Sequence, residues 1–153
     1  MFSKQEATQL RQQFWTSFGQ YLSPVPSAGN EKINWVNYKT GVRFISFRMN
    51  ADDSSAYIAI EISHSLPEQR KMYYEHFLSL KKILEKNLDG KWKWEEEGHN
   101  DSGKPVSRIY SELPGVNVFR KEDWPAIISF FKSGITGIDS FWFQYKALFE
   151  MQV

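Results

Sequence analysis

The sequence predicts an α+β fold, a single domain over residues 1–153 in which a mixed sheet of about five to six strands is flanked by helices, in the order α-β-β-β-α-β-β-α. Capping motifs and apolar residues at three- and four-residue spacing mark helices near the start, middle and end of the chain. Segments of alternating apolar and polar residues lie between them, which is typical of strands with one buried face. A chain of 153 residues with 41% hydrophobic content is long enough to bury a core of its own.

The first helix is expected to begin at Ser3, because Ser3 and Glu6 are spaced as a capping box in which each side chain bonds the other's free backbone amide. An apolar stripe follows at helical spacing, formed by Ala7, Leu10, Phe14, Phe18 and Tyr21. Pro24 and Pro26 interrupt this pattern. Residues 32–38 then predict a short apolar strand.

Residues 41–50 and 55–63 predict a β-hairpin that turns through residues 51–55. We expect Met49 to lie opposite Ala56, which would place Phe44 opposite Glu61. One side of this ribbon is predicted to face the core, namely Ile45, Phe47, Met49, Ile58, Ile60 and Ile62. The other side mixes polar and apolar residues, and its candidate binding residues are Arg48, Tyr57, Glu61 and Ser63.

A second helix is expected from Ser65, where Ser65 and Glu68 again have capping-box spacing, to about Leu88, before Gly90. Two strands follow, at residues 91–95 and 106–112, joined by a polar loop over residues 98–105.

A further short strand near residues 116–119 is the last one expected. The chain then becomes helical from Glu122 through an apolar segment that reaches Phe149. Gly134 and Gly137 lie inside this segment and are expected to bend or divide the helix.

Composition excludes several classes of function. The chain has no cysteine, which excludes a thiol nucleophile and cysteine-ligated zinc and favours a reducing, cytoplasmic location. Its net charge of +1 provides no general attraction for nucleic acid or anionic lipid. The absence of a signal-peptide pattern and of a long apolar run argues against a membrane partner. No phosphate-binding glycine loop or nucleophile elbow occurs, and no cofactor is expected.

Glu61 is the nearest candidate for a catalytic residue, although an acid on one strand face is more often a solvated or structural residue. The acidic run at residues 95–97, with His99 and Asp101, is more typical of a solvated hairpin than of a metal site, so no metal is expected. Trp92 and Trp94 would suit base stacking, but core packing is the favoured interpretation.

The element order resembles a restriction-endonuclease-like core, a family whose metal site uses an acid near the start of the second strand and an acid-x-Lys motif on the third. Here Glu61 matches the second acid, but Ser63 occupies the lysine position. Asp52 and Asp53 lie at the wrong end of the strand, and a rise of about 3.3 Å per residue separates Asp53 from Glu61 by roughly 25 Å. The resemblance therefore implies a degenerate core without the nuclease motif.

Segments spread along the chain resemble the bacterial family of domain of unknown function 4268, namely residues 12–21, 32–41, 107–110, 123–125 and 129–131. The family has no agreed catalytic residues to carry over. The resemblance implies a bacterial protein whose relatives are sometimes fused to nuclease-like or other defence-associated regions.

Three functions remain open from the sequence. The first is a non-catalytic module that binds a protein or nucleic-acid partner through Arg48, Tyr57, Glu61 and Ser63. The second is a metal-dependent nuclease with a rearranged site around Glu61, its missing partners supplied by Glu6 or Lys39. The third is a structural domain that forms a homodimer through the mixed face of the hairpin.

Overall fold

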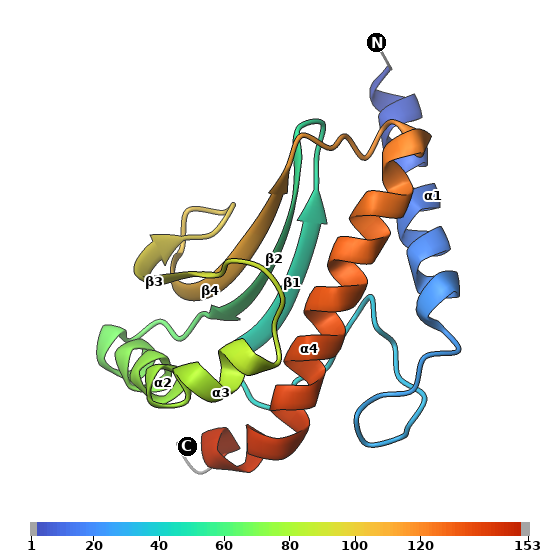
Figure 1. Cartoon of the computed structure of the whole chain (residues 1–153). Coiled ribbons are helices and arrows are strands. Elements are labelled where there is room, and N and C mark those ends of the chain that lie inside the picture. Colours follow the sequence, from blue (N-terminus) through green and yellow to red (C-terminus); the bar gives the residue numbers. More distant parts are fainter. Residues whose placement is uncertain (1–2, 151–153) are drawn as a thin grey trace.

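The computed structural model describes residues 3–150 and confirms the α+β class (Figure 1). Its elements, in chain order, are α1 (Lys4–Leu22), β1 (Ile45–Ala51), β2 (Ser55–Ile62), α2 (Pro67–Ser79), α3 (Lys81–Lys86), β3 (Lys93–His99), β4 (Pro105–Pro114), the short 3-10 helix η1 (Lys121–Asp123) and α4 (Trp124–Glu150). No helix within residues 3–150 is long and apolar enough to cross a membrane.

The sheet has four strands in the order β1-β2-β4-β3, and every neighbouring pair is antiparallel. The expectation of a mixed sheet with five to six strands was therefore wrong. Residues 32–38 form no strand, because their apolar side chains are used for packing: Trp35 is buried and donates its indole N–H to the Val25 carbonyl at 2.9 Å. Residues 116–119 meet the sheet through a backbone bond from Val118 to Asp52 and do not form a strand either.

The hairpin of β1 and β2 forms as predicted, but its register differs by two residues. Met49 lies opposite Ile58, and Ser46 rather than Phe44 lies opposite Glu61. The reason is a tighter turn, in which the Asp52 carboxylate accepts the backbone amides of Ser54 and Ser55, each at 2.9 Å. A shift of two residues leaves every side chain on its predicted face.

The core lies on one side of the sheet, and α4 runs along that side (Figure 1). Phe47 of β1 packs edge-on against Trp142 of α4 with ring centroids 5.5 Å apart. Tyr74 of α2 packs on Trp94 of β3 in the same way at 6.1 Å. Helix α1 packs on α4 through Phe14 and other aromatic residues, and its predicted capping box at Ser3 is confirmed. The core face predicted for β2 is confirmed, because Ile58, Ile60 and Ile62 are all fully buried.

The second predicted helix departs from expectation at both ends. Its first residue is Pro67, and Leu66 precedes it without a side-chain cap, so the capping box expected at Ser65 is absent. The helix also breaks at Leu80, where the backbone leaves helical geometry, and α3 continues in a new direction. Helix α3 contacts α4, and Leu84 of α3 is fully buried in the core.

Helix α4 is continuous through both glycines, so they neither divide it nor end it. They permit close packing instead. A Cβ added at Gly134 would lie 2.7 Å from Cδ1 of Ile58 in β2, and one added at Gly137 would contact the Asn87 carbonyl. The two glycines therefore set the distance between α4 and its neighbours.

Candidate functional site

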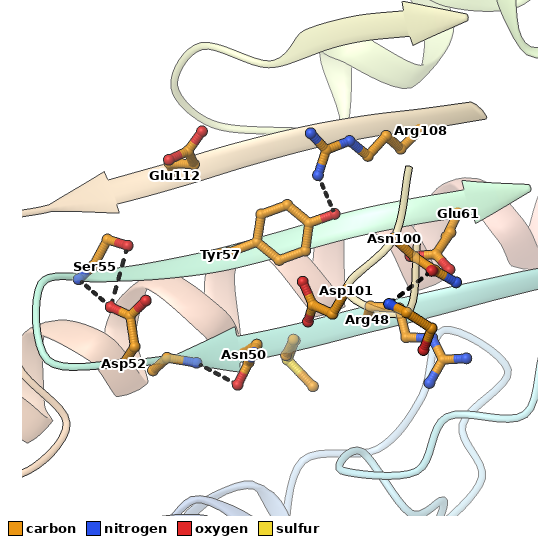
Figure 2. A pocket seen from close by; sticks show the side chains of 13 residues that line it. Arg48, Asn50, Asp52, Ser55, Tyr57, Glu61, Asn100, Asp101, Arg108 and Glu112 are labelled. Atoms are coloured by element: carbon orange, nitrogen blue, oxygen red, sulfur yellow. Dashed lines mark hydrogen bonds between the residues drawn. The ribbon is translucent and has the colours of Figure 1, made fainter. Parts of the chain in front are cut away.

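The face of the sheet opposite the helices carries polar side chains in ordered rows. Strand pairing makes each row from residues that are direct cross-strand neighbours. The first row is Asn50, Tyr57 and Glu112; the second is Arg48, Ala59, Tyr110 and Lys93; the third is Ser46, Glu61, Arg108 and Glu95. Figure 2 shows this face with the helices behind the strands. We call it the open face.

A pocket of about 610 Å³ lies on the open face and is lined mainly by polar side chains. Its walls come from β1, β2 and β4 and from residues 100–102 of the loop between β3 and β4. In Figure 2, the segment that carries Asn100 and Asp101 crosses in front of the strands. Strands that are distant in the sequence therefore build one site together with a loop.

The loop has a defined shape, because Asn100 organises its turn. The Asn100 side-chain oxygen accepts the backbone amides of Ser102 at 2.9 Å and Lys104 at 3.0 Å. Gly103 completes the turn with φ of +80°, a conformation that favours glycine. This arrangement holds Asp101 over the open face beside Glu61 and Tyr57, and the charge of Asp101 raises the pKa of both groups.

Glu61 is only 6% exposed, although it lies on the face that no helix covers. Burial raises the pKa of its carboxyl group, and the nearby Asp101 charge raises that pKa further. The positive charges of Arg48 and Arg108 and a hydrogen bond with Asn100 act in the opposite direction. Burial is the largest of these effects, so the ionised carboxylate is less favourable here than in water.

Arg108 is held in place by three groups. Its Nε donates to the Glu95 carboxylate at 2.7 Å, and its NH1 donates to the Tyr57 hydroxyl at 3.2 Å. Its guanidinium also lies over the Tyr110 ring, 4.3 Å from the centroid. The hydrogen bond that Arg108 donates to Glu95 is the main reason that the pKa of Arg108 is raised, so its charge is permanent.

The carboxylates of the pocket outnumber its cations. Arg108 is already paired with Glu95, and Arg48 is the cation that most lowers the pKa of Glu61. Glu112 lies 3.9 Å from the ammonium of Lys93. The hydrogen bond from the Ser54 amide is the main reason that the pKa of Asp52 is lowered, so Asp52 remains ionised. Asp52 and Asp101 together give the pocket an excess of negative charge.

The structure brings together three of the four residues proposed from the sequence: Arg48, Tyr57 and Glu61 all line the pocket. Ser63 lies beyond the end of β2, where its amide bonds the Phe44 carbonyl, and it does not line the pocket. Arg108 was not predicted as a site residue. Its alternation with Tyr110 and Glu112 indicates that the three residues share one face of a strand, but it does not indicate that β4 pairs with β2.

The partners suggested for a nuclease site lie elsewhere. Glu6 caps α1, and Lys39 does not line the open-face pocket but two other hollows, one beside Trp15 at the edge of β1 and one beside α4. No group of three or more histidine, aspartate or glutamate side chains suited to hold a metal ion occurs within the described residues. His99 is exposed at the end of β3, and Trp94 packs against the core.

No curated protein and no solved structure is significantly similar to this chain. The sequence profile of one family, described as domain of unknown function (DUF4268), matches residues 10–146. That range includes most of α1, the whole sheet and most of α4, and therefore every residue of the open-face pocket. The chain belongs to the DUF4268 family.

Proposed function

We propose that this domain is a binding module whose open face holds a positively charged segment of a partner protein. One observation carries the proposal: a pocket with more carboxylates than cations lies on the face that the helices leave uncovered. Lysine and arginine side chains of a partner complement such a surface. With a volume of about 610 Å³, the pocket is also large enough to take a side chain.

The arginines of the pocket offset only part of its acidic charge. Arg108 pairs with Glu95, and the charge of Arg48 lowers the pKa of Glu61. Asp101 stands on the loop over the strands, and Asp52 is kept ionised at the hairpin turn. An arriving ammonium or guanidinium group would lie between these two carboxylates.

A nucleic-acid partner is disfavoured by the same charges, because phosphates would approach an acidic surface. Aromatic stacking is also obstructed. Tyr110 is covered by the guanidinium of Arg108 at 4.3 Å from the ring centroid, and the Lys93 ammonium lies 5.8 Å from the same ring. Bases therefore find no bare aromatic platform at the centre of the sheet, in contrast to sheets that stack single strands.

Glu61 gives this binding a pH dependence. Its raised pKa means that a larger fraction is protonated near neutral pH than for an exposed glutamate. A bound cation favours the ionised carboxylate, so binding releases protons. Affinity for a cationic segment should therefore increase as the pH rises through the pKa of Glu61.

The test is fluorescence anisotropy with three labelled probes: a lysine-glycine peptide, the matching glutamate-glycine peptide and a single-stranded oligodeoxynucleotide. We expect saturable binding of the lysine peptide alone, weakened by added salt. Asp101→Asn should weaken peptide binding by about fivefold, because one partly exposed charge contributes roughly 1 kcal/mol. Asp53→Asn is the matched control, because Asp53 lies in the neighbouring turn outside the pocket.

Two results would overturn the proposal. One is preferential binding of the oligodeoxynucleotide, which would place the partner among nucleic acids. The other is an equal loss of peptide affinity in Asp101→Asn and Asp53→Asn, which would show that binding depends on overall charge and not on the pocket.

The nuclease and homodimer alternatives make different predictions. A nuclease requires Mg²⁺ or Mn²⁺ to bind and DNA or RNA to be cleaved, with both properties lost in Glu61→Ala. Calorimetric titration of the two ions, followed by incubation with single- and double-stranded substrates, separates this alternative from a binding module. A homodimer through the open face would protect Asp101 and the Tyr57 region from solvent in a concentration-dependent way, which hydrogen exchange measures.

A further inference from the structure

A second hollow lies on the other side of the molecule, between the long loop at residues 23–44 and the C-terminal half of α4. Its volume is about 650 Å³. The loop contains no helix or strand, and Figure 1 shows it beside α4 and away from the open face. Irregular loops of this length in a small domain are commonly functional.

The loop is fixed to α4 by side chains of the helix. Asp139 accepts the Ala28 amide at 2.7 Å through one oxygen and the Tyr38 hydroxyl at 2.5 Å through the other. Trp142, one turn further on, donates its indole N–H to the Thr40 carbonyl at 2.8 Å. These bonds tie both ends of the loop to one helix, so the walls of the hollow are preformed.

One wall of the hollow is aromatic and exposed. Phe143 lines it and is 57% exposed, whereas seven other phenylalanines of the described residues are buried. The backbone of Gly29 lies against this ring, where an added Cβ would be 3.2 Å from Cε1 of Phe143. Ile33 adds an aliphatic surface from the loop. A flat apolar group could therefore lie against Phe143.

Two lysines line the same hollow, and neither forms an ion pair with any of residues 3–150. The end of the Lys146 side chain lies against the backbone at Gly41, where a Cβ would contact both Nζ and Cε. Lys39 is only two residues away along the chain from that backbone. Both lysines therefore line the hollow, and the ammonium of Lys146 lies beside the segment that carries Lys39.

Two acids also line the hollow. Asp139 is 4% exposed, and both of its oxygens are occupied by donors from the loop. Glu31 is exposed and adds one accessible carboxylate. The accessible chemistry is thus an apolar ring beside two lysines and one glutamate, which leaves one positive charge in excess.

We propose that this hollow binds a small carboxylic acid with a ring-sized apolar body, the carboxylate held by Lys39 and Lys146 and the body placed against Phe143. This site does not depend on the open-face function. Charge-assisted hydrogen bonds to the ammonium groups supply the preference for a carboxylate, and burial of the ring supplies the rest of the affinity.

The test uses ¹⁵N-labelled protein titrated with phenylacetate, with its neutral amide phenylacetamide and with phenethylamine. The indole N–H signal of Trp142 reports on the hollow, and that of Trp92, which lies before β3, is the internal control. We expect phenylacetate to shift the Trp142 signal to saturation while the Trp92 signal stays fixed. The amide should bind about tenfold more weakly, because it loses one charged hydrogen bond.

Variants then separate the two lysines from general charge. Lys146→Gln and Lys39→Gln should each weaken phenylacetate binding by about tenfold and should weaken amide binding less. Lys82→Gln on α3, far from the hollow, should change neither. Equal binding of acid and amide, shifts of both tryptophan signals, or no binding of phenylacetate by the folded protein would each overturn the proposal. An unchanged ligand-free spectrum shows that a variant is folded.

Discussion

Removing the hydroxyl group of Tyr38 should detach the long loop from α4 in a measurable way. In Tyr38→Phe the ring remains, so its packing at 5.0 Å from the Phe47 ring is kept. Only the bond to Asp139 is lost. That carboxylate is almost fully buried, and water has little access to replace the missing donor.

The expected cost follows from the charge on the acceptor. A hydrogen bond to a charged group contributes about 1.5–3 kcal/mol to the free energy of unfolding. Asp139 keeps its second donor, the Ala28 amide, so the carboxylate is not left wholly unpaired. We therefore expect a loss of about 2 kcal/mol, which lowers the melting temperature of a domain of this size by roughly 4–8 °C.

Urea denaturation followed by tryptophan fluorescence measures this change, with the slope of the transition expected to stay constant. Tyr21→Phe is the control, because Tyr21 is 54% exposed and its substitution should change stability by less than about 0.5 kcal/mol. Equal stability of Tyr38→Phe and Tyr21→Phe would show that the bond between Tyr38 and Asp139 does not stabilise the fold.

The same bond predicts a pH dependence with a definite sign. Burial and the Asp139 interaction raise the pKa of Tyr38 above its ordinary value of 10.0. The folded state thus holds this proton more tightly than the unfolded state does. Its stabilising effect is complete below about pH 10 and is lost as the pH rises further. The stability gap between wild type and Tyr38→Phe should therefore narrow above about pH 10, and a constant gap would contradict the assignment.

Three further predictions concern the open face and the helix packing. The pKa of Glu61 in the folded state lies above its ordinary value of 4.5, so ionisation of Glu61 lowers the free energy of unfolding as the pH rises above 4.5. Glu61→Gln should reduce this loss of stability, which urea titrations at a series of pH values measure. Arg48→Gln should raise the pKa of Glu61 further, and by more than Arg108→Gln does, since Arg48 is the stronger of the two cations; carboxyl ¹³C shifts measure this order. Gly137→Ala should destabilise the domain by about 1–3 kcal/mol in urea, although alanine favours a helix by about 1 kcal/mol, because the new Cβ would meet the Asn87 carbonyl.

Features that depend on neighbouring residues could be predicted from the sequence. The capping box at Ser3 needs only a side chain and an amide three residues apart, and it forms. The inward face of β2 follows from alternation alone, and Ile58 and Ile60 are fully buried there. In each case the physical cause lies within one element.

Features that depend on distant segments could not be predicted. Residues 32–38 have the composition of a strand, but Trp35 and Tyr38 bond the loop and α4 instead of a sheet neighbour. Asp139 has no local signal, because its two partners lie 111 and 101 residues away in the sequence. The pairing of β4 with β2 is likewise non-local, and it is what brings Arg108 beside Glu61.

Glu61 shows how local and distant causes combine in one site. Alternation alone places it on the outer face of β2, where an acid is ordinarily solvated. Its 6% exposure excludes that interpretation. The residues that surround Glu61 come from outside β2. Arg48 and Arg108 flank Glu61 from the neighbouring strands, and the loop that carries Asn100 lies over it. Burial makes the charge of this acid less favourable, and Arg48, Arg108 and Asn100 act in the opposite direction. The environment of Glu61 is therefore set by two neighbouring strands and a loop, which alternation within β2 cannot reveal.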